Sequence, residues 1–246
     1  MKIIRSYRQL DPAQIVETIA ALKRRIDERF PSAGLANVIA ELRKVAEESI
    51  ELNRWTSRAN IPVRILSWVL ASCIIALVAN FLMRMRLPDM LDMVNFTQFL
   101  EAALSAIAFI GATIYFLATY ESRVKRKRVL RAIQELRSMA HIVDMHQLTK
   151  DPDRYLLKAT FTESSPKRTM TLFELGRYLD YSCESLSLIS KVAAIYVQGF
   201  DDDAVLQAVD EIETLTVGLS AKISQKIVIL NDVAERNGNT IEGSSC

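Results

Sequence analysis

The sequence predicts an all-α membrane protein, in which a two-span transmembrane helical hairpin carries a cytoplasmic helical bundle with coiled-coil character. Two apolar runs support this prediction: residues 65–83 and 102–120 are each 19 residues long and contain no charged side chain. An α-helix needs about 20 such residues to cross a hydrocarbon layer of about 30 Å. Glycine (7) and proline (6) are rare among the 246 residues, which favours helices over turn-rich sheets.

Residues 1–61 are predicted to form a cytoplasmic helical hairpin. Asp11 followed by Pro12 is typical of a helix start, with an N-cap acceptor and then proline at the first helical position. The apolar residues that follow at helical spacing are Ile15, Ile19, Leu22 and Ile26. Residues 30–34 interrupt the pattern, and a second apolar stripe then predicts a helix that runs toward Trp55. We expect Pro62 to mark a bend where the chain meets the membrane.

Residues 62–84 and 99–120 are the two predicted spans, joined by the short connector 85–98. Basic residues flank the spans on the side away from the connector: Arg54, Arg58 and Arg64 before the first, and Arg123, Lys125, Arg126, Lys127, Arg128 and Arg131 after the second. The positive-inside rule therefore places both termini in the cytoplasm and the connector outside. We expect an integral protein of the bacterial inner membrane.

Residues 121–148 are predicted to continue the second span as a cytoplasmic helix. Val129, Ile133, Leu136, Ala140 and Val143 follow the 4-3-4-3 spacing of a coiled-coil seam. The cluster Lys125, Arg126, Lys127 and Arg128 lies where this helix would leave the lipid, so we expect it to contact anionic headgroups. No aromatic residues are interleaved with it, and nucleic acid is not an expected ligand.

The C-terminal part is predicted to be an irregular segment at 149–170, a helical hairpin at 171–236 and a disordered tail at 237–246. Alternation of Tyr155, Leu157, Ala159 and Phe161 allows a short strand pair in the irregular segment. Thr171 with Glu174 forms a capping box, and Gly199 is placed to end that helix. Asp201, Asp202 and Asp203 precede a last helix with an almost unbroken heptad register.

His141, Asp144 and His146 are the one metal-like cluster in the sequence, and they include both histidines of the chain. On a helix, His141 and Asp144 share a face, whereas His146 joins them only if the helix ends nearby. Histidine and carboxylate ligands suit zinc or manganese. The alternative is a helix terminus whose polar side chains bond to the backbone and to the following loop. A divalent metal is therefore the one cofactor under consideration.

Within the spans, Asn80 is the most polar residue, and an amide in hydrocarbon seeks a partner across a helix interface. Ser72 with Ala76, and Ala108 with Ala112, give the spacing of small residues that lets helices approach closely. This packing serves either the hairpin itself or contact between chains. If several chains gathered around an axis, Asp89 and Asp92 of the connector would form an acidic ring at an outer mouth.

The layout of long helices around a two-span hairpin resembles that of mitochondrial calcium uniporter pores. The resemblance is one of architecture alone. The acidic W-D-x-x-E-P type of pore motif is absent, and the connector reads Arg-Leu-Pro-Asp-Met-Leu-Asp-Met from Arg86 onward.

The expected function is that of a membrane-anchored structural or interaction protein, which presents its bundle for self-assembly or for a cytoplasmic protein partner. Its other partners would be membrane lipids and copies of itself. One alternative is an oligomeric ion channel or pore, because two spans from one chain cannot enclose a water path. A second alternative is a metal-dependent enzyme or sensor that uses His141 and Asp144. No glycine-rich phosphate loop, nucleophile elbow, zinc-protease or kinase motif occurs, so an enzyme is not expected.

Overall fold

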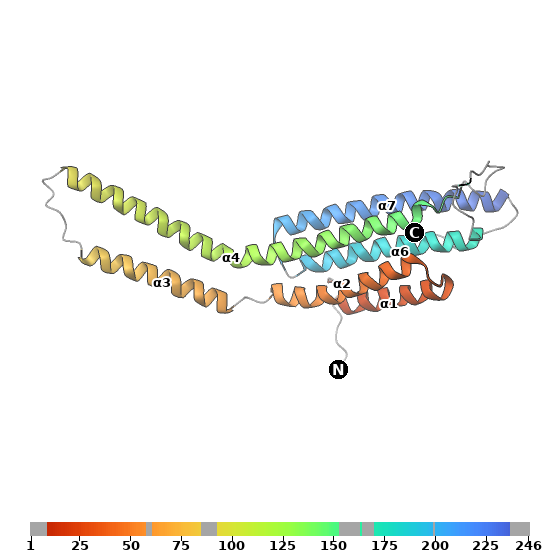
Figure 1. Cartoon of the computed structure of the whole chain (residues 1–246), viewed down its shortest axis with the longest axis horizontal. Coiled ribbons are helices and arrows are strands. Elements are labelled where there is room, and N and C mark those ends of the chain that lie inside the picture. The colour runs from red at the N-terminus through yellow and green to blue at the C-terminus, as the bar shows by residue number, and fades with distance from the viewer. Residues whose placement is uncertain are drawn as a thin grey trace, which may run out of the picture. The chain divides into compact units, whose positions relative to one another are not determined.

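The structure is a computed structural model, and it describes residues 9–57, 61–84, 93–152, 163, 170–198 and 200–236. The regular secondary structure in this part of the chain is entirely α-helical, as the sequence predicts. The six helices are α1 (Pro12–Arg29), α2 (Gly34–Ser57), α3 (Ile61–Arg84), α4 (Met93–Leu148), α6 (Leu172–Val197) and α7 (Asp203–Arg236) (Figure 1). They belong to two compact units, Met1–Ser57 with Arg128–Cys246, and Arg58–Lys127.

The first two helices of the bundle unit begin and end where the sequence predicts. Asp11 is the N-cap of α1, its carboxylate accepts from the Ala13 N–H at 3.0 Å, and Pro12 occupies the first turn. The predicted apolar stripe is fully buried: Ile15, Ile19, Leu22 and Ile26. The break at residues 30–33 separates α1 from α2, and the two helices pack against each other.

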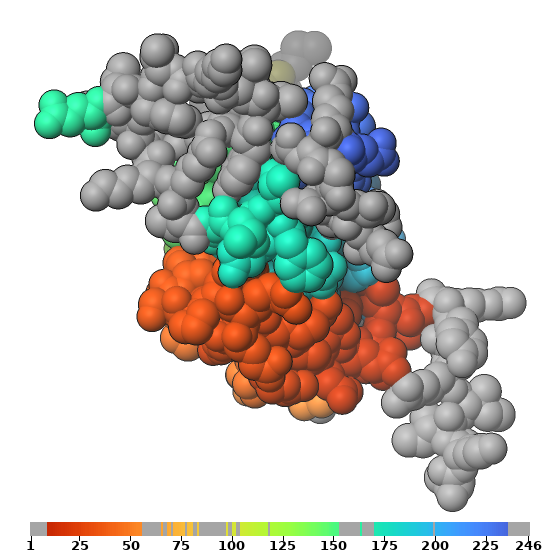
Figure 2. All heavy atoms as spheres, turned by 90° about the vertical axis from the view of Figure 1, so that its right-hand side faces the viewer, coloured from red at the N-terminus to blue at the C-terminus, as the bar shows by residue number. Residues whose placement is uncertain are grey.

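Helix α6 is the centre of the bundle, because it packs against α1, α2 and α7. Its buried residues extend from Leu175 to Tyr196 and cover most of the helix surface, and a stripe that includes Ser187 and Lys191 is exposed. Figure 2 shows the atoms of α1 and α2 directly against those of α6 at one end of the bundle. The start of α6 is fixed by the predicted capping box, in which Thr171 and Glu174 bond each other's backbone N–H groups.

The second half of α4 and the whole of α7 complete the core. The predicted seam of α4 is buried, from Val129 to Val143. Helix α7 begins with Asp202 as a cap, since its Oδ1 accepts from the Ala204 and Val205 N–H groups at 3.1 and 3.3 Å. Lys226 of α7 then reaches α4, where its Nζ donates to the carbonyl and the side-chain oxygen of Gln147 at 3.2 and 2.6 Å.

Ion pairs between the bundle helices lie on its surface. Arg25 of α1 forms a two-pronged pair with Glu184 of α6, and Arg137 of α4 pairs with Glu211 of α7 at 3.1 Å. All four side chains are more than a third exposed, so each pair contributes about 0–1 kcal/mol. The apolar core, rather than these pairs, therefore holds the bundle together.

The second unit contains α3 and the first part of α4. One helical stretch among the described residues is long and apolar enough to cross a membrane, the part of α4 that starts at Leu104. The corresponding apolar stretch of α3, Ala71–Asn80, is shorter. Pro62 is the second residue of α3, where a proline fits the first turn of a helix, and the residues just before α3, where the predicted bend would lie, are outside the described residues.

Several sequence predictions fall outside the described residues. They are the strand pair at residues 155–161, the helix-ending role of Gly199, most of the connector between α3 and α4, and the tail 237–246. They stay predictions.

The central position of α6 predicts a large difference between two leucine-to-alanine variants. Leu186 of α6 is 0% exposed, whereas Leu206 of α7 is 46% exposed. We expect L186A to lower the free energy of unfolding by about 2–5 kcal/mol, because the deleted apolar atoms are no longer buried on folding and a cavity is left behind. L206A should lower it by less than about 1 kcal/mol. Urea unfolding of the full chain in nanodiscs, followed by circular dichroism, measures both, and equal losses would contradict a core centred on α6.

Candidate functional site

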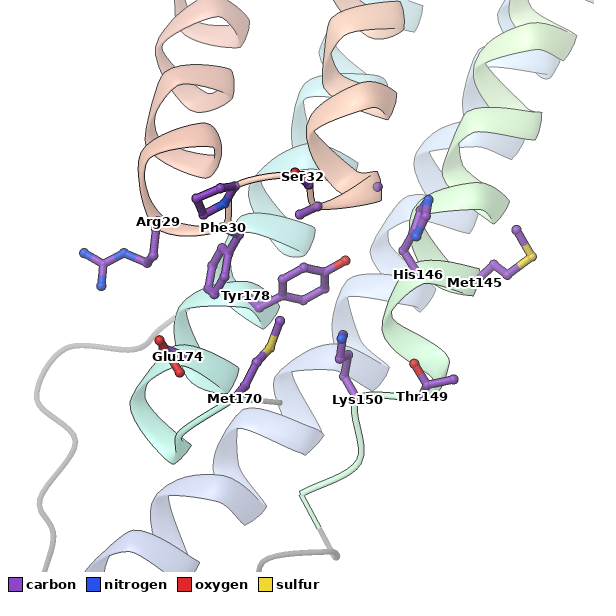
Figure 3. Close-up of a pocket in the computed structure, with 13 residues that line it drawn as sticks. Arg29, Phe30, Ser32, Met145, His146, Thr149, Lys150, Met170, Glu174 and Tyr178 are labelled. Carbon is purple, nitrogen blue, oxygen red and sulfur yellow. The ribbon is translucent and has the colours of Figure 1, made fainter. Parts of the chain in front are cut away.

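A pocket of about 490 Å³ opens at one end of the bundle, where the α1–α2 loop, the end of α4 and the start of α6 meet. Figure 3 shows the side chains that line it. The residues are Arg29, Phe30, Pro31, Ser32, Ala33, Gly34, Met145, His146, Thr149, Lys150, Met170, Glu174 and Tyr178. Three segments that are far apart in the sequence therefore supply this site, which we call the end pocket.

The α1–α2 loop is anchored on α6 by an aromatic contact. The Phe30 ring meets the rings of Tyr178 and Tyr181 edge-on, with centroids 5.5 and 6.2 Å apart. The backbone N–H of Phe30 closes the last turn of α1 with a 2.7 Å bond to the Ile26 carbonyl. Ser32 then adopts a left-handed conformation, with φ of 70°, which turns the chain into α2.

Gly34, the first residue of α2, lies against the ring of His146 from α4. A Cβ atom at this position would come 2.3 Å from the His146 Cε1 atom, far inside van der Waals contact. Only glycine therefore lets the loop approach α4 with the imidazole in its present place. This contact closes one wall of the end pocket and gives His146 a packing role.

Tyr178 forms the floor of the end pocket. Its side chain is only 3% exposed, and burial raises its pKa to about 12, so the hydroxyl stays protonated at neutral pH. In Figure 3 this hydroxyl points into the space between the loop and α4. Among the described residues, no hydrogen-bond partner lies within reach of it. The hydroxyl oxygen itself is not enclosed, so it is accessible from the pocket.

Lys150 supplies a positive charge beside the Tyr178 ring. The residue follows the end of α4, where its backbone N–H bonds the Gln147 carbonyl at 2.9 Å. Its ammonium lies 5.1 Å from the centroid of the Tyr178 ring, a cation–π distance. No carboxylate of the described residues lies within salt-bridge distance of it. The ammonium is therefore available to a bound anion.

Glu174 is the one carboxylate among the described residues that line the end pocket, and it is already engaged. Glu174 accepts from the backbone N–H and the hydroxyl of Thr171 at 2.8 and 3.0 Å, and the backbone bond holds its pKa below the usual range. Arg29 stands at the rim, over the Phe173 ring at 5.2 Å. Since Arg29 and Lys150 together outweigh Glu174, the described lining of the pocket has a positive balance.

The predicted metal cluster is not assembled as a unit. His141 is exposed, and His146 packs on Gly34. Asp144 accepts a 2.6 Å bond from the Gln147 amide, which itself accepts from Lys226. The described part of the chain contains no group of three or more His, Cys, Asp or Glu side chains that is placed to hold a metal ion. The metal hypothesis therefore enters neither proposal below.

Of the predicted headgroup cluster, three members are exposed: Arg126, Lys127 and Arg128. Lys125 is buried and pairs with Glu121 at 2.8 Å along α4, and Arg128 stacks on Trp55 at 4.8 Å. The predicted interface residues of the apolar unit all have exposed side chains: Ser72, Ala76, Asn80, Ala108 and Ala112. Asp89 and Asp92 lie outside the described residues.

The end pocket was not predicted from the sequence. Tyr178 follows an apolar stripe and Lys150 follows a helix end, and neither position alone indicates a ligand. The signal that was present lies at residues 30–34, where Ser32 and Gly34 mark an unusual turn. Comparison of the chain with protein-family models, with curated proteins and with solved structures finds no match, so the site is interpreted from its geometry.

The contact between Gly34 and His146 predicts the sign of two glycine-to-alanine changes. Gly218 lies in α7 with open space around it, so G218A should raise the free energy of unfolding by about 0.5–1 kcal/mol through helix propensity. G34A should instead lower it by up to about 1 kcal/mol, because the partly exposed His146 ring must move aside. The double variant G34A/H146A should lose less free energy of unfolding than the sum of the losses in G34A and H146A. Urea unfolding tests this cycle, and stabilisation by G34A would contradict it.

Proposed function

We propose that the chain is a membrane-anchored interaction protein, whose two-span hairpin fixes the helical bundle to the cytoplasmic face of a membrane and assembles with copies of itself. The exposed apolar side chains of the second unit support this proposal most directly. More than half of each of these side chains is exposed: Ile65, Trp68, Val69, Ile75 and Met83 of α3, and Leu100, Leu104, Ile107, Phe109, Tyr115 and Phe116 of α4. A surface of this kind would associate or aggregate in water, whereas lipid would cover it.

The helix lengths suit this role. Helix α3 has 24 residues, which correspond to about 36 Å at 1.5 Å per residue. Residues 99–120 of α4 give about 33 Å by the same rise. Both exceed the hydrocarbon thickness of about 30 Å, so α3 spans the membrane together with α4 in this proposal, although its most apolar stretch is shorter.

The charged residues beside the two spans favour a cytoplasmic bundle. Arg54 near the end of α2 is exposed, as are Arg126 and Lys127 on α4. Basic residues within about 15–20 positions of a span are retained on the cytoplasmic side. The exposed cations would also attract anionic headgroups.

Small residues on α4 favour contact between chains rather than within one. Ala108 and Ala112 share a helix face and are exposed, as is Gly111, around which a Cβ atom would meet nothing within 4 Å. Helices approach each other closely in lipid where such residues face a neighbour. Since no described part of the same chain covers this face, a second copy is the partner that we propose.

The membrane location predicts protection of Cys73, which is exposed on α3. In sealed inside-out vesicles, whose outer surface is the cytoplasmic face, a membrane-impermeant maleimide should leave Cys73 unlabelled, because a thiol in hydrocarbon is neither reached nor ionised. Peptide mass spectrometry reads the label at this position. A cysteine introduced by K222C on the exposed side of α7 serves as the reactive control. Fast labelling of Cys73 in intact vesicles would contradict the proposed span.

If the chains associate through α4, two alanine-to-isoleucine changes on this helix should differ in their effect on the association. Ala108 lies on the face with Ala112, whereas Ala106 is exposed on the opposite face. A108I should weaken association about tenfold or more by keeping the helices apart, and A106I should leave it unchanged. Native mass spectrometry from nanodiscs measures the oligomer fraction. A monomeric parent chain, or equal effects of both variants, would refute the assembly.

A further inference from the structure

The end pocket offers the hydroxyl of Tyr178 to a ligand. The Tyr178 residue is 3% exposed, and its hydroxyl points into the pocket without a protein partner among the described residues. The hydroxyl oxygen itself is not enclosed, so it can donate to an acceptor that enters the pocket. The hydroxyl therefore indicates where a polar atom of a ligand would lie.

The charges around this hydroxyl indicate the sign of that ligand. The Lys150 ammonium lies over the Tyr178 ring at 5.1 Å, and Figure 3 shows it directed upward into the same space. Glu174 is held by Thr171 at the start of α6. A negatively charged group could therefore accept from both the ammonium and the phenol, and charge-assisted bonds of this type are the stronger ones.

A second cavity of the bundle provides a contrast. It has about 450 Å³ and lies between α2, α4 and α6, with Tyr196 on its wall. There the carboxylates Glu48 and Glu135 join burial in raising the pKa of Tyr196. Because those carboxylates would repel an anion, the second cavity lacks the positive balance of the end pocket. Two buried tyrosines of one helix thus face opposite electrostatic surroundings.

The end pocket also has an apolar side, and it is large enough for a small organic molecule. Phe30, Met145 and Met170 line it, and methionine adapts its shape to different apolar groups. Its volume of about 490 Å³ lies within the range of about 300–1,000 Å³ typical of small-molecule sites. A bare inorganic ion would leave most of this space unfilled.

We propose that the end pocket binds a small organic anion, whose phosphate or carboxylate group accepts from Lys150 and Tyr178 while its apolar body packs against Phe30, Met145 and Met170. This site is independent of the membrane anchoring proposed above, since every residue that it uses belongs to the bundle unit.

Ligand-observed NMR on the full chain in phosphatidylcholine nanodiscs tests the proposal. Phenyl phosphate and benzoate represent the two anionic groups on one aromatic body, and phenol is the uncharged analogue. We expect at least one of the two anions to bind with a Kd below about 1 mM and phenol to bind at least tenfold more weakly. Empty nanodiscs give the background from lipid. The stronger of the two anions identifies which group the pocket prefers.

Three substitutions assign the binding to the proposed atoms. K150M removes the charge and should weaken binding about 10- to 100-fold, whereas Y178F keeps the ring packing and should weaken it about 2- to 10-fold. K150R keeps the charge and should retain binding. K222M removes an exposed lysine from α7 and is the matched control, with no expected change.

Three results would overturn the proposal. They are the absence of binding by both anions at millimolar concentration, equal binding of phenol, and unchanged binding by both K150M and Y178F. Since Y178F and K150R preserve shape and charge respectively, their circular dichroism spectra and melting curves show whether a loss of binding arises from a loss of fold.

Discussion

The burial of α6 on most of its sides is the constraint on which the rest of the bundle depends. A helix surrounded by others must place small or polar residues where space is short, and it must satisfy each polar group locally. Ser182 and Ser185 do so by donating to the carbonyls of Tyr178 and Tyr181 at 2.9 and 2.6 Å. These serines are fully buried at no hydrogen-bonding cost. Helices α1, α2 and α7 can therefore pack around α6, and the second half of α4 completes the same core.

The same constraint produces the end pocket. Near its start, α6 carries the large ring of Tyr178. This ring packs edge-on against Phe30 and so fixes the position of the α1–α2 loop relative to α6. Gly34 then approaches His146 so closely that no other residue fits without a movement of the ring. Because both contacts are fixed by the core, the space between them is fixed as well. A pocket whose walls are set before a ligand arrives loses little conformational entropy on binding.

The helices were predictable from the sequence because their signals are local. Asp11 with Pro12, and Thr171 with Glu174, specify helix starts within four residues, and the seam from Val129 to Val143 needs only a period of 3.5. The pocket was not predictable because Gly34, His146 and Tyr178 meet only after the bundle has formed. The burial of the α6 face that carries Ser182 and Ser185 was not predictable either. Serines are typical of surface positions, and these two are buried because their hydroxyls bond the preceding turn of the helix. His141 and Asp144 share a helix face as predicted, but the described part of the chain brings no third ligand to them, and Asp144 accepts from Gln147.

Helix α4 combines two kinds of sequence pattern in one continuous element of 56 residues. Its first part is apolar all round, which a helix tolerates in lipid but not in water. Its second part is apolar along one seam, which is the pattern of a helix with one side in a core and the other in solvent. The change occurs between Glu121 and Arg131, where charged residues appear on every side of the helix. A single unbroken helix can carry both patterns because its backbone hydrogen bonds are satisfied internally in either medium, so only the side chains need to change where the proposed membrane ends.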